Sequence, residues 1–312
     1  IKSAQYSGIM SASDIARGIY YAVEMGADVI NMSFGGYGRS QAEEDALAPA
    51  FSTAVLVAAA GNSSRYNEGI DPYTQLPCFM GANMYPGAYN WVLGVMARNS
   101  FADQYGNNLA GFSNMDCAAE DYSEYELMAP GAHIWSTLPF QGYGAWSGTS
   151  MAAPVVSGIA ALARTLWSDK NSYSSRFIMG QIAATAPWVQ AFTPLGREPV
   201  FYRSADALTT LTTAPQPKLT YLEHWLFDTK EIGATNDNDG IVDAGETVEL
   251  AIVIRNHWGK ADNVRVKLDA QAYGAAGPDP YIEMLVDTVN YGAVGSFNND
   301  DNGLIYDAEG VI

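Results

Sequence analysis

Apolar residues in the first hundred positions follow two patterns, helical spacing and short continuous runs. Helical spacing predicts helices over residues 13–26 and 41–52. The continuous runs, at residues 28–32, 55–59 and 89–97, have the length of buried strands. Strands that are apolar on both faces and alternate with helices indicate an α/β fold, with a parallel sheet covered by helices on both faces.

Two more helices are expected further along this part of the chain. Residues 150–167 are almost wholly apolar or small, as is typical of a helix in the protein interior. Residues 174–184 predict a second helix, which ends before Pro187.

The pattern changes after a Thr- and Pro-rich stretch at residues 209–218. Beyond it, residues 247–255 and 264–268 alternate between apolar and polar positions. Period-two strands separated by turn-rich loops predict an antiparallel β-sandwich. We therefore expect two domains joined by a linker over residues 209–218. They are a larger α/β domain over residues 1–208 and a smaller, partial β-sandwich over residues 219–312.

Composition bounds the class of protein. The chain has 312 residues, of which 48% are hydrophobic, enough for a sizeable core. The formal net charge of −18 opposes binding to nucleic acid or anionic lipid and suits a secreted protein. No apolar run is expected to reach the length of a membrane span. The sequence starts at Ile1 without a methionine or signal peptide, so we expect it to be processed or cut from a longer protein.

A candidate nucleophile lies where the long apolar helix begins. Residues 148–154 read Gly-Thr-Ser-Met-Ala-Ala-Pro, a small-residue turn followed by the helix. Ser150 would expose its hydroxyl there, and its own N–H would have no partner within the helix. Free N–H groups at a helix start favour developing negative charge. Nucleophile and oxyanion donor would thus coincide in one residue, although a plain helix cap also explains a Thr-Ser pair.

Residues 148–154 resemble the serine motif of the subtilisin-like serine peptidases. Three other segments resemble this family in the family's order: residues 29–36 (VINMSFGG), 57–62 (VAAAGN) and 127–131 (LMAPG). The resemblance extends to about Leu208. It implies a subtilisin-like three-layer fold whose N-terminal strands are missing here, and a serine endopeptidase that needs no cofactor for catalysis.

The resemblance also implies roles for individual residues. Asn62 would donate its side-chain amide to the oxyanion, beside the N–H of Ser150. Its alternative role is that of a turn residue after Gly61. The primary substrate pocket would be lined by Ser33, Phe34, Gly35, Ala60 and Gly61. A mostly apolar, glycine-edged pocket predicts a preference for large uncharged side chains in a peptide substrate.

The sequence lacks the other half of the catalytic machinery. Serine needs a base, which in this family is a histidine oriented by an aspartate, both located before the segment that matches residues 29–36. That region holds no histidine here, and His133, His224 and His257 match no family motif. We therefore expect this chain alone to be inactive. Its expected partners are the missing N-terminal half of the catalytic domain or, through an exposed sheet edge, a second copy.

The second domain contains a candidate calcium loop. Residues 235–246 fit the template D-x-[DN]-x-[DN]-G-x₅-E except at Thr235. The expected ligands of a structural calcium ion are Asp237, Asp239, the carbonyl of Ile241, Asp243 and Glu246. Residues 298–309 fit the template more weakly. The alternative is a pair of acidic hairpin loops without metal.

The two cysteines, Cys78 and Cys117, lie in loop-like stretches of the first domain. A disulfide between them would suit an extracellular, oxidising compartment, and two free thiols are the alternative.

These features bear on three possible functions. The favoured hypothesis is a fragment of a secreted bacterial subtilisin-like endopeptidase with an immunoglobulin-like domain appended. A non-catalytic binding or scaffold protein on the same fold is the alternative. A general α/β hydrolase is disfavoured, because residues 148–152 lack the second glycine of a G-x-S-x-G turn and no histidine follows before the linker.

Overall fold

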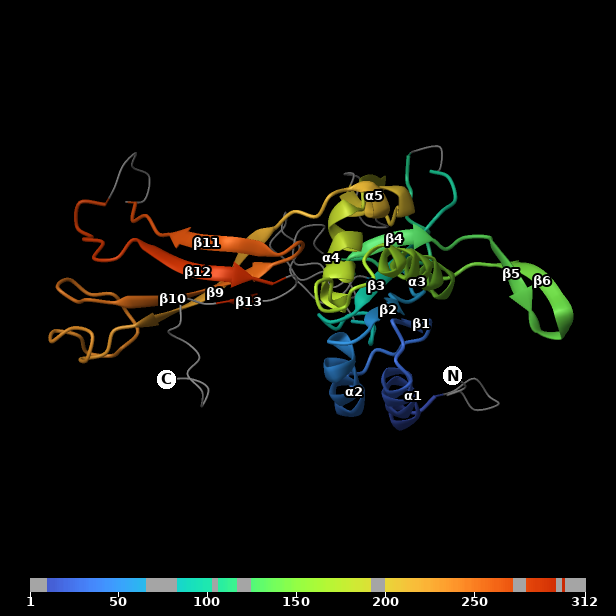
Figure 1. Ribbon diagram of the computed structural model, residues 1–312, viewed down its shortest axis with the longest axis horizontal. Helices are drawn as coiled ribbons and strands as arrows, with labels where there is room; N and C mark the ends of the chain where they lie inside the picture. The colour runs from blue at the N-terminus through green and yellow to red at the C-terminus, as the bar shows by residue number, and fades with distance from the viewer. Residues whose placement is uncertain are drawn as a thin grey trace. The chain divides into compact units, whose positions relative to one another are not determined.

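The computed structural model describes residues 10–65, 83–102, 106–116, 125–191, 200–271, 279–295 and 299–300. The chain divides into two compact units, residues 1–214 and 215–312 (Figure 1). The division falls inside the stretch expected to be a linker, whose first residues lie in helix α5 (Ala207–Thr212).

The first unit is built on a parallel sheet of four strands in the order β1-β2-β3-β4. The strands are β1 (Val29–Met32), β2 (Val55–Ala59), β3 (Leu93–Arg98) and β4 (Leu127–Pro130). Each neighbouring pair is parallel, so the predicted α/β architecture is confirmed. All five residues of β2 are buried, which explains the continuous apolar run that predicted this strand.

Helices surround this sheet. Helices α1 (Ala12–Glu24) and α2 (Gln41–Phe51) pack on each other and lie side by side in Figure 1. Helix α3 (Thr149–Leu166) contacts all four strands, and α4 (Ser175–Thr185) packs on α3. Helix α3 therefore lies at the centre of the core, which explains its strongly apolar sequence.

One helix in the described part of the chain, α3, meets the length and hydropathy of a membrane span, with 18 residues and a mean hydropathy of 1.2. The expectation that no apolar run reaches such a length is therefore wrong. In this fold α3 packs along the sheet, as the core helix of a globular domain does.

Strand β1 is an edge strand of the sheet, and no other strand among the described residues pairs with its outer side. Val29 and Ile30 are half-buried and Asn31 is exposed, whereas β2 beside it is buried throughout. An open, largely apolar edge of a parallel sheet can pair with a further strand.

Two antiparallel ribbons complete the first unit. Strands β5 (Ile134–Leu138) and β6 (Gly142–Trp146) enclose the short 3₁₀ helix η1 (Pro139–Gln141) and lead directly into α3 (Figure 1). Strands β7 (Trp188–Ala191) and β8 (Val200–Arg203) form the other ribbon.

The second unit consists of small antiparallel sheets, as the alternating pattern predicts. One sheet has the order β13-β10-β9 and the other pairs β11 with β12. The strands are β9 (Leu219–Phe227), β10 (Glu249–Asn256), β11 (Ala261–Lys267), β12 (Thr288–Val294) and β13 (Asn299–Asp300). Ile254, Val264 and Tyr291 from three of these strands share one buried cluster. A largely apolar cavity of about 400 Å³ is lined by residues of β9, β10 and β11.

Candidate active site

Ser150 lies at the second position of α3, directly after the turn that the sequence motif predicted. Gly148 is the N-cap and has no side chain to occupy the free N–H groups of the first helical turn. Gly148 and Thr149 are buried, whereas Ser150 is partly exposed. Gly131 allows this tight approach, because a Cβ there would lie 2.8 Å from the carbonyl oxygen of Gly148. The helix start thus presents Ser150 to solvent on a rigid, glycine-bounded turn.

Ser150 and Ser33 exchange hydrogen bonds across the site. The Oγ of Ser150 donates to the carbonyl oxygen of Ser33 over 3.0 Å, and the Oγ of Ser33 donates to the carbonyl oxygen of Ser150 over 2.9 Å. Ser33 follows the end of β1, so this pair fixes the edge strand β1 against the start of α3. A peptide carbonyl is a very weak base, and this contact therefore does not activate the serine.

No histidine or carboxylate receives a hydrogen bond from Ser150 within the described ranges. His133 lies just before β5 and is exposed, and its backbone N–H donates to Ser147 Oγ. His224 and His257 belong to the second unit, where they contact Tyr221 and Thr220 respectively.

Asn62 is held beside the helix start by Thr149. The Oδ1 of Asn62 accepts hydrogen bonds from the N–H of Thr149 over 2.8 Å and from the hydroxyl of Thr149 over 3.0 Å. The same hydroxyl accepts a hydrogen bond from the N–H of Gly61 over 3.0 Å. Because Oδ1 takes both bonds from Thr149, the Nδ2 group of this exposed side chain remains available as a donor. Sequence reasoning did not assign this role to the buried Thr149.

The two predicted walls of the substrate pocket meet at Met84. A Cβ at Gly35 would lie 2.9 Å from Met84 Sδ, and a Cβ at Gly61 would lie 2.6 Å from Met84 Cε. The thioether side chain therefore fits between two glycines that belong to different strand ends. Ala60, on the same wall as Gly61, is fully buried, and Phe34 is half-buried. The sequence gives no signal for Met84, because the residues around it show no helical or strand periodicity.

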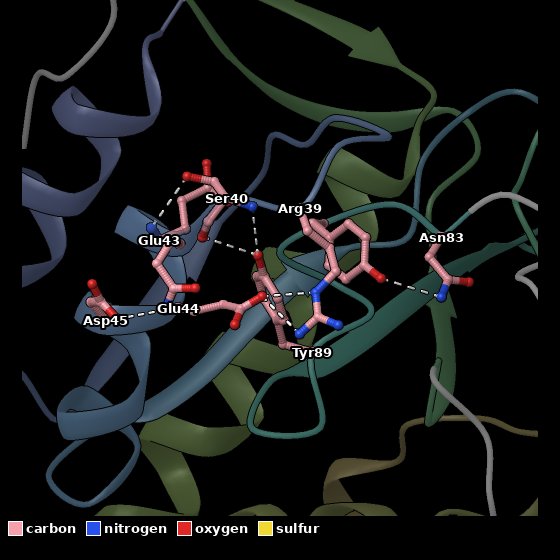
Figure 2. Close-up of polar contacts among 9 residues, drawn as sticks. Arg39, Ser40, Glu43, Glu44, Asp45, Asn83 and Tyr89 are labelled. Carbon is pink, nitrogen blue, oxygen red and sulfur yellow. Dashed lines mark hydrogen bonds and ion pairs between the residues drawn. The ribbon is translucent and has the colours of Figure 1, made fainter.

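Polar contacts hold the loop that follows residues 33–36, and Figure 2 shows those around Arg39 and Ser40. Gly36 and Tyr85 exchange backbone hydrogen bonds of 2.9 and 2.8 Å. Arg39 lies 5.8 Å from the ring centres of both Tyr85 and Tyr89, and its Nε donates to Glu44 over 2.8 Å. The hydrogen bond from Arg39 to Glu44 raises the pKa of the guanidinium further. These contacts fix the loop that leads from β1 into α2.

Burial affects two ionisable groups at the start of α2. Ser40 caps α2 through its side chain, and its backbone N–H donates to the Tyr89 hydroxyl over 3.2 Å (Figure 2). Burial raises the pKa of Glu43 and the pKa of Tyr89 above their ordinary values.

The acidic loop of the second unit brings together a different set of carboxylates from the template set. Ligand atoms of Asp228, Asp237 and Asp239 lie within 4.8 Å of one another. Asp228 is buried and accepts a hydrogen bond from the N–H of Gly240 over 2.9 Å. Desolvation and the neighbouring Asp239 raise the pKa of Asp237. Asp228 was missed because it precedes the template by several residues.

The remaining template residues have other contacts. The carboxylate of Glu246 accepts backbone hydrogen bonds from Asp237 over 3.1 Å and from Asp243 over 2.9 Å. Ile241 is exposed, and its N–H donates to Asp239 Oδ1 over 2.8 Å. The carboxylate cluster found among the described residues does not include Asp243 or Glu246.

Some expected sites lie outside the described residues. Cys78 and Cys117 are among them, as is most of the second template match at residues 298–309.

These contacts define a class of site. A serine at the start of a core helix, with a side-chain amide held beside the same helix start, is typical of serine hydrolases that stabilise an oxyanion. The family model described as the subtilase family, Peptidase S8, matches residues 1–218. The chain belongs to the subtilase family of serine peptidases.

Individual relatives agree with this assignment. Subtilisin DY of Bacillus licheniformis is 35% identical over 187 residues, which are 60% of this chain and 59% of that protein. The major intracellular serine protease of Bacillus subtilis (strain 168) is 37% identical over 183 residues, 58% of this chain and 48% of that protein. The solved structure of the prenylagaramide maturation protease PagA is 25% identical with a TM-score of 0.50, covering 67% of this chain and 69% of that one. The chain spans about half the length of the curated relatives it matches.

Proposed function

We propose that this chain carries the nucleophile half of a serine endopeptidase that hydrolyses peptide bonds through an acyl-enzyme on Ser150. The observation that carries the proposal is the double hydrogen bond from Thr149 to Asn62 Oδ1. Because Oδ1 is used by Thr149, the amide Nδ2 group of Asn62 can donate to another acceptor beside the helix start that bears Ser150. An oxyanion would lie between this Nδ2 group and the N–H of Ser150.

The chemistry follows from these positions. Ser150 Oγ would attack the scissile carbonyl carbon while a base takes its proton, and the carbonyl oxygen would become the oxyanion. Collapse of this intermediate would release the amine, which takes up the proton, and leave an ester on Ser150. Water would then hydrolyse the ester and regenerate the serine.

We further propose that this chain is inactive alone and that another polypeptide segment supplies the base. Ser150 donates its proton to the carbonyl of Ser33, which cannot accept it fully. Strand β1 ends at Met32 and Ser33 follows it, so a segment that pairs with the outer side of β1 would arrive next to Ser150. The missing part of a subtilase catalytic domain is the proposed occupant, and pairing with a second copy is the competing outcome.

A fluorophosphonate probe tests both proposals, with Ser150→Ala as the control. The 312-residue chain is expected to label no faster than the S150A variant. Adding or fusing the segment that provides the base is expected to give rapid labelling at Ser150. Rapid labelling of the chain alone would contradict the missing base, and no labelling of the complemented protein would contradict the peptidase.

The proposed substrate is a polypeptide bound in extended form along Ser33, Phe34 and Gly35, because the backbone groups of Gly36 are already bonded to Tyr85. These three residues are at least partly exposed, as strand addition requires. Gly35, Gly61 and the adjacent Met84 would give the proposed pocket apolar walls, which favours large uncharged side chains. A peptide library cleaved by the complemented enzyme would show this preference.

The alternative function is a non-catalytic binding protein on the same fold. The contact of Ser150 with a carbonyl instead of a base favours this alternative. It predicts that no added segment restores labelling, while extended peptides still bind.

For the second unit, we propose an immunoglobulin-like β-sandwich that holds a structural calcium ion. Three clustered carboxylates, Asp228, Asp237 and Asp239, are the oxygen ligands that Ca²⁺ prefers. The sandwich is supported by two small antiparallel sheets with a shared buried cluster.

We also propose that the protein is secreted from a bacterium, as the net charge of −18 suits. Two relatives are named intracellular serine proteases, so fractionation of the producing cells distinguishes the two locations.

A further inference from the structure

The turn that carries Asn62 is bonded along its length to a distant segment, residues 111–115. Three backbone hydrogen bonds join them: Asn114 N–H to Gly61 O over 2.8 Å, Ser64 N–H to Phe112 O over 3.0 Å, and Met115 N–H to Arg65 O over 2.8 Å. The hydroxyl of Ser64 adds a bond of 2.6 Å to the carbonyl of Gly111. The position of Asn62 therefore depends on this segment as well as on β2.

The side chain of Asn114 is the centre of this contact. It is fully buried. Its Oδ1 accepts from the N–H of Ser63 over 3.0 Å and from the N–H of Arg65 over 3.2 Å. Its Nδ2 donates to the carbonyl of Ala60 over 2.8 Å and to the hydroxyl of Tyr37 over 3.3 Å. All four hydrogen-bonding positions of a primary amide are thus used.

These four bonds reach both walls of the proposed pocket. Ala60 and Ser63 lie on either side of Gly61 and Asn62, at the end of β2. Tyr37 lies in the loop after β1, one residue beyond the Gly36 that pairs with Tyr85. The guanidinium of Arg65 also stacks over the Tyr37 ring at 5.1 Å. A single buried amide therefore connects the oxyanion turn with the opposite wall.

Gly61 shows how closely Asn114 fits this turn. Its φ is +104°, and a Cβ at this position would lie 2.5 Å from Asn114 Nδ2. Any displacement of the Asn114 amide would therefore change the space around Gly61 and the direction of the following Asn62.

We propose that Asn114 is a positioning residue that sets the Asn62 amide and the width of the substrate pocket together. The proposal rests on the proposed function of Asn62 as an oxyanion donor. Asn114 would not touch the substrate, and it would act through the turn at residues 60–65 and through Tyr37. Loss of its amide is expected to weaken both peptide binding and the discrimination between side chains.

Three variants separate the contact of Asn114 with the turn at residues 60–65 from its contact with Tyr37. Asn114→Asp keeps the acceptor for Ser63 and Arg65 but loses the donors to Ala60 and Tyr37. Asn114→Ala loses all four bonds. Tyr37→Phe removes only the bond to the opposite wall, and it serves as the matched variant if either Asn114 variant fails to fold.

The first measurement is peptide affinity, using the full chain and two acetylated tetrapeptide amides that end in Phe or Ala. Asn114→Ala and Asn114→Asp are expected to weaken the Phe peptide about tenfold and to reduce the Phe-over-Ala preference. Tyr37→Phe is expected to reduce the preference about threefold. Wild-type affinity and preference in all three variants, with only a lower melting temperature, would overturn the proposal.

The second measurement does not depend on peptide binding. The side-chain amide resonance of Asn62 in NMR spectra is expected to shift in both Asn114 variants and to stay in place in Tyr37→Phe. Amide hydrogen exchange at Ser63 and Arg65 is expected to accelerate in Asn114→Ala only. Absence of binding of either peptide to the wild-type chain would contradict the proposed function, not the positioning role of Asn114. An unmoved Asn62 resonance in both Asn114 variants would overturn the positioning role itself.

Discussion

Ser150 Oγ donates to the carbonyl of Ser33 over 3.0 Å, and Ser33 Oγ returns a bond of 2.9 Å to the carbonyl of Ser150. This reciprocal pair joins the end of β1 to the start of α3. It places Ser150 beside β1, the edge strand of the sheet.

Replacing Ser33 by Ala should destabilise the fold by about 1 kcal/mol, because the partly buried hydrogen bond to Ser150 is lost together with an exposed one from Asn31. Urea denaturation of the full chain measures the change. Ser136→Ala, at an exposed position of β5, is the control and should change stability by less than about 0.5 kcal/mol. Equal effects of the two substitutions would contradict a specific role of the Ser33–Ser150 pair.

Two glycine substitutions should change stability in opposite directions. Gly61→Ala should cost about 2 to 4 kcal/mol, because φ is +104° and a Cβ would lie 2.5 Å from Asn114 Nδ2. Gly158→Ala, inside α3 with open space around it, should stabilise by about 0.5 to 1 kcal/mol. Thermal unfolding of both variants tests the pair, and a loss of stability in Gly158→Ala would show an unrecognised contact at that helix position.

Glu43 should make stability depend on pH. Burial raises its pKa above the ordinary value of 4.5, so the folded state holds the proton more tightly than the unfolded state. Its contribution therefore favours folding below the ordinary pKa and is lost as the pH rises through the raised value. Glu43→Gln should be relatively more stable than wild type at about pH 7 than at about pH 4. A variant-minus-wild-type difference that is the same at both pH values would exclude this effect.

Calcium should stabilise the second unit, and the choice of ligands can be tested. Addition of calcium is expected to raise the melting temperature, and a chelator should reverse the rise, because an ion that binds only the folded state shifts the folding equilibrium. Asp228→Asn should abolish the rise, because Asp228 belongs to the carboxylate cluster. Asp243→Asn should leave it in place. The reverse result would support the template ligands, and no rise in wild type would leave the loop as a hairpin without metal.

The sequence by itself determined the features that depend on local pattern. Continuous apolar runs predicted β2 and β3, because strands buried on both faces must be apolar throughout. The turn at residues 148–150 and the apolar run after it predicted α3 with Ser150 at its start. The change to period-two alternation predicted the antiparallel sheets of the second unit.

Only the tertiary structure decided which side chains meet. Ser33 and Ser150 are 117 positions apart, and Asn62 and Thr149 are 87 positions apart. Met84, Asn114 and Asp228 lie in stretches without a helical or strand period, so no local pattern distinguishes them from loop residues. Their roles arise because the sheet and α3 bring distant loops to one place, where burial requires every polar group to find a partner.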